Sequence, residues 1–109
     1  MKTMRKRLAE EKTYLISLRR DFHQHPELSL REFRTAARIE EELDCFGIPH
    51  TRVGETGVLG TLLGTGTGAG IVVLRADIDA LPIQETGGAE YCSRTDCSRH
   101  AADFRDCRT

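Results

Sequence analysis

The sequence contains no tryptophan, and aromatic residues make up only 6% of its 109 residues. It also lacks an excess of charge, because 16 basic residues are balanced by 17 acidic ones and the net charge is −1. A polyanion-binding surface needs a strong positive bias, so we expect no nucleic-acid partner. Hydrophobic residues at 39% and charged residues at 30% are typical of one small soluble domain, or of part of a larger one.

No long hydrophobic run is present. The first seven residues include four basic ones, but only Leu8-Ala9-Glu10-Glu11 follows them. A signal peptide needs an apolar stretch at this point, and a membrane span needs about 20 apolar residues. We therefore expect a cytoplasmic location and no membrane association. The cysteines are then expected to be reduced thiols; they are Cys45, Cys92, Cys97 and Cys107.

Two amphipathic helices are expected in the first half of the chain. Apolar residues on one stripe predict a helix over 5–24, which ends where His25 precedes Pro26. A second helix is expected over 30–46, because Ser29 and Glu32 have the spacing of a capping box. Leu28 and Phe33 occupy the positions of a hydrophobic staple, and Gly47 that of a left-handed C-terminal residue.

After Gly47 the pattern changes to one typical of strands. Short β-branched segments predict strands over 48–53 and 58–63, separated by a turn at 54–57. The uninterrupted apolar run at 71–74 is typical of a strand that is buried on both faces. The expected class is α/β, with two helices followed by three strands.

The C-terminal residues have a different composition. Residues 88–109 hold few apolar side chains and no periodicity, so we divide the chain into a domain segment, 1–87, and an irregular or disordered tail, 88–109. This tail contains a possible zinc-ligand set whose spacing does not follow the rhythm of common zinc modules; its members are Cys92, Cys97, His100 and Cys107.

Two short segments carry candidate functional residues. Arg75, Asp77 and Asp79 directly follow the apolar run, and ligands bind beyond the carboxyl ends of strands in open α/β sheets. A solvated strand end is the alternative for this pattern. His23 and His25 are two positions apart, so they would not share a helix face, and capping of a helix end is favoured over metal ligation.

Three blocks together resemble a known family. Residues 18–29 (LRRDFHQHPELS), 54–58 (GETGV) and 74–85 (LRADIDALPIQE) are similar, in order and spacing, to the N-terminal blocks of metal-dependent amidohydrolases. These include hippurate hydrolase, bacterial N-acyl-amino-acid amidohydrolases and indole-acetyl-amino-acid hydrolases, within the aminoacylase and carboxypeptidase-like zinc metallopeptidases. The resemblance covers about residues 10–95.

The resemblance implies the start of a zinc-exopeptidase-like catalytic domain. The expected reaction is hydrolysis of the amide bond of a small N-acyl amino acid, with two divalent ions (zinc, manganese or cobalt) in the complete family enzyme. Asp77 corresponds to the family's aspartate beside the metal centre and is the one expected catalytic residue. Arg75 stands where related peptidases carry a ligand histidine, and His23 and His25 are not family metal ligands.

The sequence departs from the family at its next motif, His-Ala-Cys-Gly-His-Asp. His100 and Ala101 are present, but Ala102 and Phe104 occupy the positions of the ligand Cys and His. We therefore expect a truncated amidohydrolase that binds no metal and is inactive alone. The alternatives are a non-enzymatic fragment that pairs with a full-length relative, or a small zinc-binding module formed by the tail. The sequence carries no signal for the oligomeric state.

Overall fold

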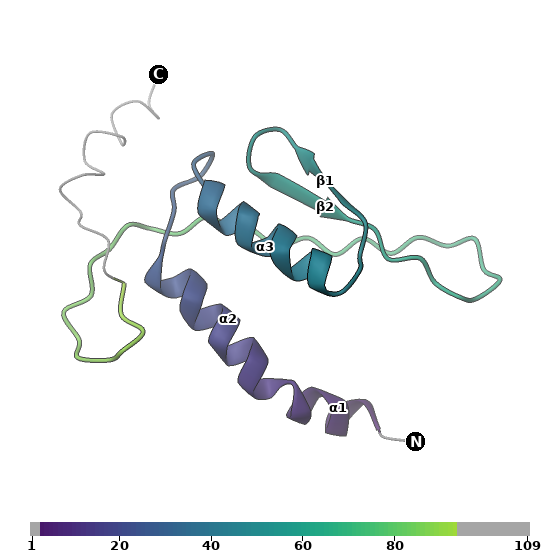
Figure 1. Cartoon of the computed structure of the whole chain (residues 1–109), viewed down its shortest axis with the longest axis horizontal. Helices are drawn as coiled ribbons and strands as arrows, with labels where there is room; N and C mark the ends of the chain where they lie inside the picture. The colour runs from purple at the N-terminus through teal and green to yellow at the C-terminus, as the bar shows by residue number, and fades with distance from the viewer. Residues whose placement is uncertain (1–2, 94–109) are drawn as a thin grey trace. The chain divides into compact units, whose positions relative to one another are not determined.

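The computed structural model describes residues 3–93, which contain three helices followed by a two-stranded sheet (Figure 1). The expected α/β class is confirmed. The chain divides into two compact units. One contains the residues up to Pro26 together with those from Leu81 onward, and the other spans Glu27–Ala80.

The first unit begins with helices α1 (Met4–Glu10) and α2 (Lys12–Gln24). The prediction of one continuous helix over 5–24 is wrong, because the helix is interrupted at Glu11, where ψ is −3°. Neither helix buries a residue, so no packing holds this stretch in one continuous helix. The predicted end is confirmed, because His25 leaves helical geometry, with φ −125° and ψ 61°, directly before Pro26.

The second unit begins with α3 (Phe33–Cys45), and the predicted beginning of this helix is wrong. Leu30 has a φ of 68°, so it is not helical, and Ser29 does not cap the helix. Instead, the Glu27 carboxylate accepts hydrogen bonds from the first turn of α3. A carboxylate offers two strong acceptor oxygens, where a serine hydroxyl offers one weaker acceptor. The predicted end at residue 46 differs by one residue from the observed end at Cys45. Gly47 has the predicted left-handed conformation, with a φ of 67°.

A hairpin follows α3. Strands β1 (His50–Val53) and β2 (Gly57–Gly60) pair antiparallel, with His50 opposite Gly60 and Val53 opposite Gly57. The predicted strands and turn are confirmed, although both strands are shorter than expected. A side chain at Gly57 would bring its Cβ within 2.5 Å of the Val53 carbonyl oxygen, so the turn requires glycine there.

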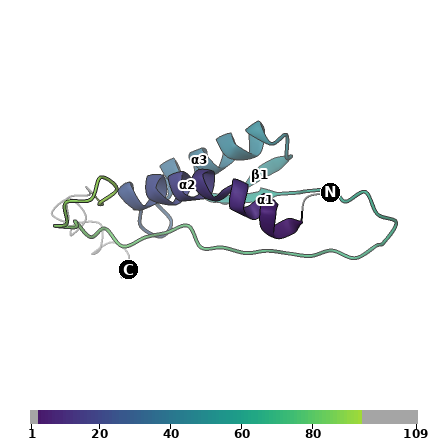
Figure 2. The same cartoon turned by 90° about the horizontal axis from the view of Figure 1, so that it is seen from below.

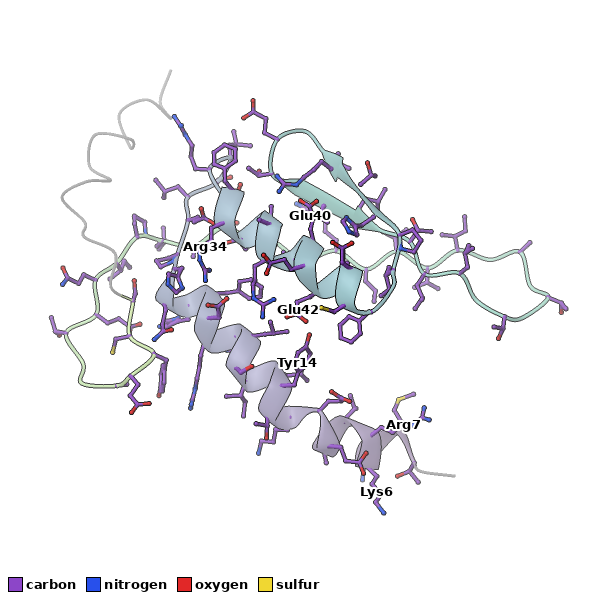
Figure 3. The ribbon with its side chains drawn as sticks, in the orientation of Figure 1. Lys6, Arg7, Tyr14, Arg34, Glu40 and Glu42 are labelled. Atoms are coloured by element: carbon purple, nitrogen blue, oxygen red, sulfur yellow. The ribbon has the colours of Figure 1, made fainter. Side chains whose placement is uncertain are left out.

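Helix α3 packs against β2. The Leu43 side chain lies beside Gly60, where an added Cβ would meet the Leu43 Cδ2 atom at 3.4 Å. Ala36 is completely buried at the other end of the helix. Glu40, which is labelled on α3 in Figure 3, pairs with Arg52 and also lies 3.8 Å from the imidazole of His50. These side-chain contacts join the helix to β1.

The central buried strand predicted at 71–74 is wrong for the described residues. This run forms no strand, and its side chains are 80–94% exposed. Figure 2 shows the segment between β2 and residue 80 as a long trace without an arrow. A strand is buried on both faces only within a sheet whose two faces are covered by other elements, and the sheet within residues 3–93 consists of β1 and β2 alone.

Candidate functional site

Asp77 lies in the exposed segment that follows the 71–74 run. An Nη atom of Arg75 donates to Asp77 Oδ1 at 3.2 Å, and the two side chains are 87% and 74% exposed. An ion pair in this setting contributes about 0–1 kcal/mol, so it orients the carboxylate only weakly. In the described part of the chain, Asp77 is therefore a solvated side chain in an irregular segment.

The two histidines of the signature point to different partners. His23 Nε2 lies 2.6 Å from Glu85 Oε1. His25 Nδ1 lies 2.9 Å from the backbone oxygen of Asp21, one turn earlier in α2. The predicted capping of a helix carbonyl is therefore confirmed for His25. The two imidazoles do not converge on one site.

The Glu85 carboxylate has a second side-chain partner, the thiol of Cys92. Hydrogen bonds from the Cys92 thiol and then from His23 are the main causes that lower the pKa of the Glu85 carboxyl below its ordinary value. The Cys92 sulfur also lies 3.1 Å from the carbonyl oxygen of Gly87. The sequence places Glu85 in a family block but gives no sign that it contacts His23, which is 62 positions earlier.

Further contacts hold the segment after Leu81 against α2. The Arg20 guanidinium lies 4.3 Å from the centre of the Tyr91 ring, and the Gln24 amide donates to the Glu90 carbonyl oxygen. A shallow groove of about 250 Å³ is left between them. Its lining residues are Ile16, Arg19, Arg20, His23 and Tyr91.

Two carboxylates, Glu27 from the signature and Glu32 just after its first block, have structural roles in the second unit. Glu27 caps α3, as described above. Glu32 is 6% exposed and accepts a hydrogen bond of 2.7 Å from the Thr56 hydroxyl in the hairpin turn. Burial raises the pKa of Glu32, but the bond from Thr56 and backbone hydrogen bonds from Glu32 and Leu30 outweigh it and lower the pKa. The buried carboxylate therefore joins the start of α3 to the hairpin in its ionised form.

The described residues do not fit a metal site on their own. Among residues 3–93, no three His, Cys, Asp or Glu side chains are grouped so that they would hold an ion. Cys92 is buried beside Gly87. The other members of the possible zinc set, Cys97, His100 and Cys107, lie outside the described residues, as do Ala102 and Phe104. No helix in the described part of the chain is long and apolar enough to cross a membrane.

Comparison with known proteins identifies similar hydrolases, although no protein-family model matches the chain. It is 40% identical over 94 residues to N-acetylcysteine deacetylase of Bacillus subtilis (strain 168), which covers 82% of this chain and 24% of that protein. It is 45% identical over 91 residues to an uncharacterised hydrolase of Staphylococcus aureus (strain USA300), covering 84% of this chain and 23% of the other.

A solved structure agrees with these matches. The crystal structure of the Bacillus subtilis YxeP protein, a dinuclear metal-binding peptidase of the M20 family, matches with a TM-score of 0.69 and 42% identity. The match covers 77% of this chain and 24% of that one. The fold is therefore that of the start of an M20 peptidase domain, and the chain spans about a quarter of the length of the relatives that it matches.

Proposed function

We propose that the chain belongs to the M20 family of hydrolases over the segment that it shares with these relatives, and that the whole protein hydrolyses the amide bond of small N-acyl amino acids. The observation that carries this proposal is the 40% identity to N-acetylcysteine deacetylase over 94 residues. By its name, that relative removes an acyl group from the nitrogen of an amino acid. The matched segment covers 82% of this chain.

Within this function, we assign the present segment to the framework of the catalytic domain. Glu27 and Glu32 fix the start of α3 and its connection to the hairpin. His23 and Glu85 hold the segment after Leu81 against α2. These four side chains therefore position the backbone, and Asp77 is the residue that we propose to lie in the active site.

The chain of 109 residues is proposed to be inactive by itself. Ala102 and Phe104 stand at the two positions where the family motif supplies metal ligands, and neither side chain carries a donor atom. Two divalent ions belong to the proposed whole protein, and no group of ligands for them exists among residues 3–93. A cytoplasmic location is part of the same proposal.

A chimera tests the proposed function. Residues 10–93 of this chain would replace the matching segment of the Bacillus N-acetylcysteine deacetylase, and hydrolysis of N-acetylcysteine would be measured. We expect the chimera to retain activity. Asp77→Asn in the chimera should lower kcat/KM by about 100-fold or more, as is typical when a group that acts on the reacting centre is removed.

Asp79→Asn is the matched control, because it removes the same charge two positions away. We expect it to reduce activity much less than Asp77→Asn. A well-folded chimera with no activity would contradict the family function of this segment. Equal losses in the two variants would contradict the role of Asp77.

A further inference from the structure

His50, the first residue of β1, lies between two carboxylates of α3. Its Nε2 atom is 2.7 Å from Asp44 Oδ1, and its Nδ1 atom is 3.8 Å from Glu40 Oε2. Glu40 and Asp44 are four positions apart, so they lie on the same face of the helix. The side chain of His50 is only 14% exposed. Each ring nitrogen of His50 therefore faces an acidic side chain.

The hydrogen bond to Asp44 determines which ring nitrogen carries a proton first. An ionised carboxylate can only accept hydrogen bonds, so Nε2 of His50 donates to it. In the neutral ring, Nδ1 then holds a lone pair, and this lone pair faces the negative charge of Glu40. A second proton, at Nδ1, makes the ring cationic and turns an unfavourable contact into an attractive one.

The charges around His50 balance only when the ring is protonated. Arg52, two positions along β1, donates from Nε to Glu40 and from an Nη atom to the Glu55 carbonyl oxygen. With a neutral ring, one positive charge stands against two carboxylates. With a protonated ring, two positive charges stand against the same two carboxylates. In the described part of the chain, β2 adds no charge to this group, because all residues of Gly57–Gly60 are uncharged.

We propose that His50 is a pH-sensitive latch, which fastens β1 to α3 through Glu40 and Asp44 when Nδ1 takes up a proton from solvent. Imidazole is the side chain whose charge usually changes between about pH 5 and 8, and carboxylates are generally ionised above about pH 5. The latch is therefore closed at about pH 6 and opens as the pH rises toward about 8. Its stabilisation is present while the ring is protonated and is lost when the proton leaves.

The strand that the latch holds buries little else against α3. The three residues of β1 after His50 are exposed, and Val53 is 58% exposed. The side-chain contacts of His50 and Arg52 are therefore important in tying this strand to the helix. Local opening is easiest where few buried apolar contacts resist it. A single proton can then change how often the hairpin separates from the helix.

Amide exchange of the complete chain, measured by NMR at about pH 6 and about pH 8, tests the latch. Protection factors remove the intrinsic effect of pH on exchange. We expect the amides of β1 and β2 to be about twofold to fivefold more protected at the lower pH, the effect of one charge pair near the surface. His50→Gln keeps a side-chain N–H for Asp44 but cannot take up a proton, so this difference should disappear.

Two variants of α3 form a matched pair. Asp44→Asn and Glu41→Gln each remove one negative charge, from side chains that are 73% and 69% exposed. Asp44 contacts His50, whereas Glu41 lies 3.6 Å from Arg38. Asp44→Asn should reduce the pH-dependent protection of the hairpin, and Glu41→Gln should leave it unchanged.

The nitrogen chemical shifts of the His50 ring show independently where the proton lies. Nε2 should be protonated throughout, and Nδ1 should gain its proton as the pH falls from about 8 to about 6. Three results would overturn the proposal. They are an Nδ1 atom that stays unprotonated at about pH 6, pH-dependent protection that persists in His50→Gln, or equal effects of Glu41→Gln and Asp44→Asn.

Discussion

The Glu27 carboxylate accepts hydrogen bonds from both the backbone N–H and the hydroxyl of Thr35, at 2.6 and 2.7 Å. The N–H of Arg34 adds a third bond at 3.1 Å. The N–H groups in the first turn of a helix have no partner within the helix, and the helix dipole favours a negative charge there. A residue six positions before Phe33 therefore serves as the cap of α3.

Replacement of Glu27 should destabilise the protein. Glu27→Ala removes all three bonds, and we expect the free energy of unfolding to fall by about 1–2 kcal/mol, the cost of losing a helix cap. Ser29→Ala is the control and should change it by less than about 0.5 kcal/mol. Urea unfolding followed by circular dichroism would measure both. A larger loss of stability in Ser29→Ala than in Glu27→Ala would instead support the capping box that the sequence predicts.

The error at Ser29 shows which part of the fold the sequence predicts. The apolar stripe of α3 and Gly47 depend on local periodicity and backbone conformation, so they are readable from the sequence. Whether Ser29 or Glu27 caps the helix depends on the path of the chain between residues 27 and 33. No local pattern encodes that path. The strand at 71–74 failed for a related reason, because burial depends on neighbours that the run itself does not specify.

The contact between Glu32 and Thr56 should make stability depend on pH. Since folding lowers the pKa of Glu32, the unfolded state binds more protons, and stability rises with pH. The stability that the ionised Glu32 contributes is fully present above pH 4.5, the ordinary pKa of this carboxyl. It is lost as the pH falls through the lower pKa that Glu32 has in the folded protein. Thr56→Val removes the hydroxyl donor and should lower the free energy of unfolding by about 1–3 kcal/mol at neutral pH.

Measurement of stability between pH 3 and about 7 would test this dependence. The Thr56→Val protein should show a shallower loss of stability in acid, because its Glu32 is less favourably ionised in the folded state. Thr51→Val, on exposed β1, is the matched control and should leave the acid dependence unchanged. Parallel curves for the Thr56→Val and unmodified proteins would contradict the role of Glu32.

The His23–Glu85 pair should control the order of the segment after Leu81. His23→Ala removes one anchor, and we expect faster amide exchange over residues 83–93, because this segment contains no helix or strand of its own. The His23–Glu85 contact weakens as the pH falls through the lowered pKa of Glu85, because the carboxylate becomes protonated. In acid, amide exchange in the unmodified protein should therefore approach the faster exchange of the His23→Ala variant. His25→Ala should leave this segment unchanged, since the imidazole of His25 lies against Asp21 near the end of α2. Equal effects of the two substitutions would exclude His23 as a specific anchor.

The sequence located the blocks of the candidate site but not the contacts within them. Asp77 and Arg75 were readable because they follow an apolar run in a recognisable pattern. The contact of His23 with Glu85 joins positions 62 apart, and no periodicity connects them. Side-chain pairs of this kind are set by the tertiary path of the chain, which is why the signature predicted a family but not the role of each member.

The last prediction is that the 109-residue chain does not hydrolyse N-acyl amino acids above background, even with added zinc, manganese or cobalt. Ala102 and Phe104 supply no donor atoms at two positions where the family motif has ligands, and residues 3–93 contain no group of three ligating side chains. The variant Ala102→Cys/Phe104→His should remain inactive, because two side chains are fewer than the three or four protein ligands of a typical zinc site. Hydrolysis of hippurate and N-acetylcysteine would be followed by release of the free amino acid, with Asp77→Ala as the control. Metal-dependent turnover that disappears in the Asp77→Ala protein would show that the chain is a complete enzyme and would overturn its assignment as a framework segment.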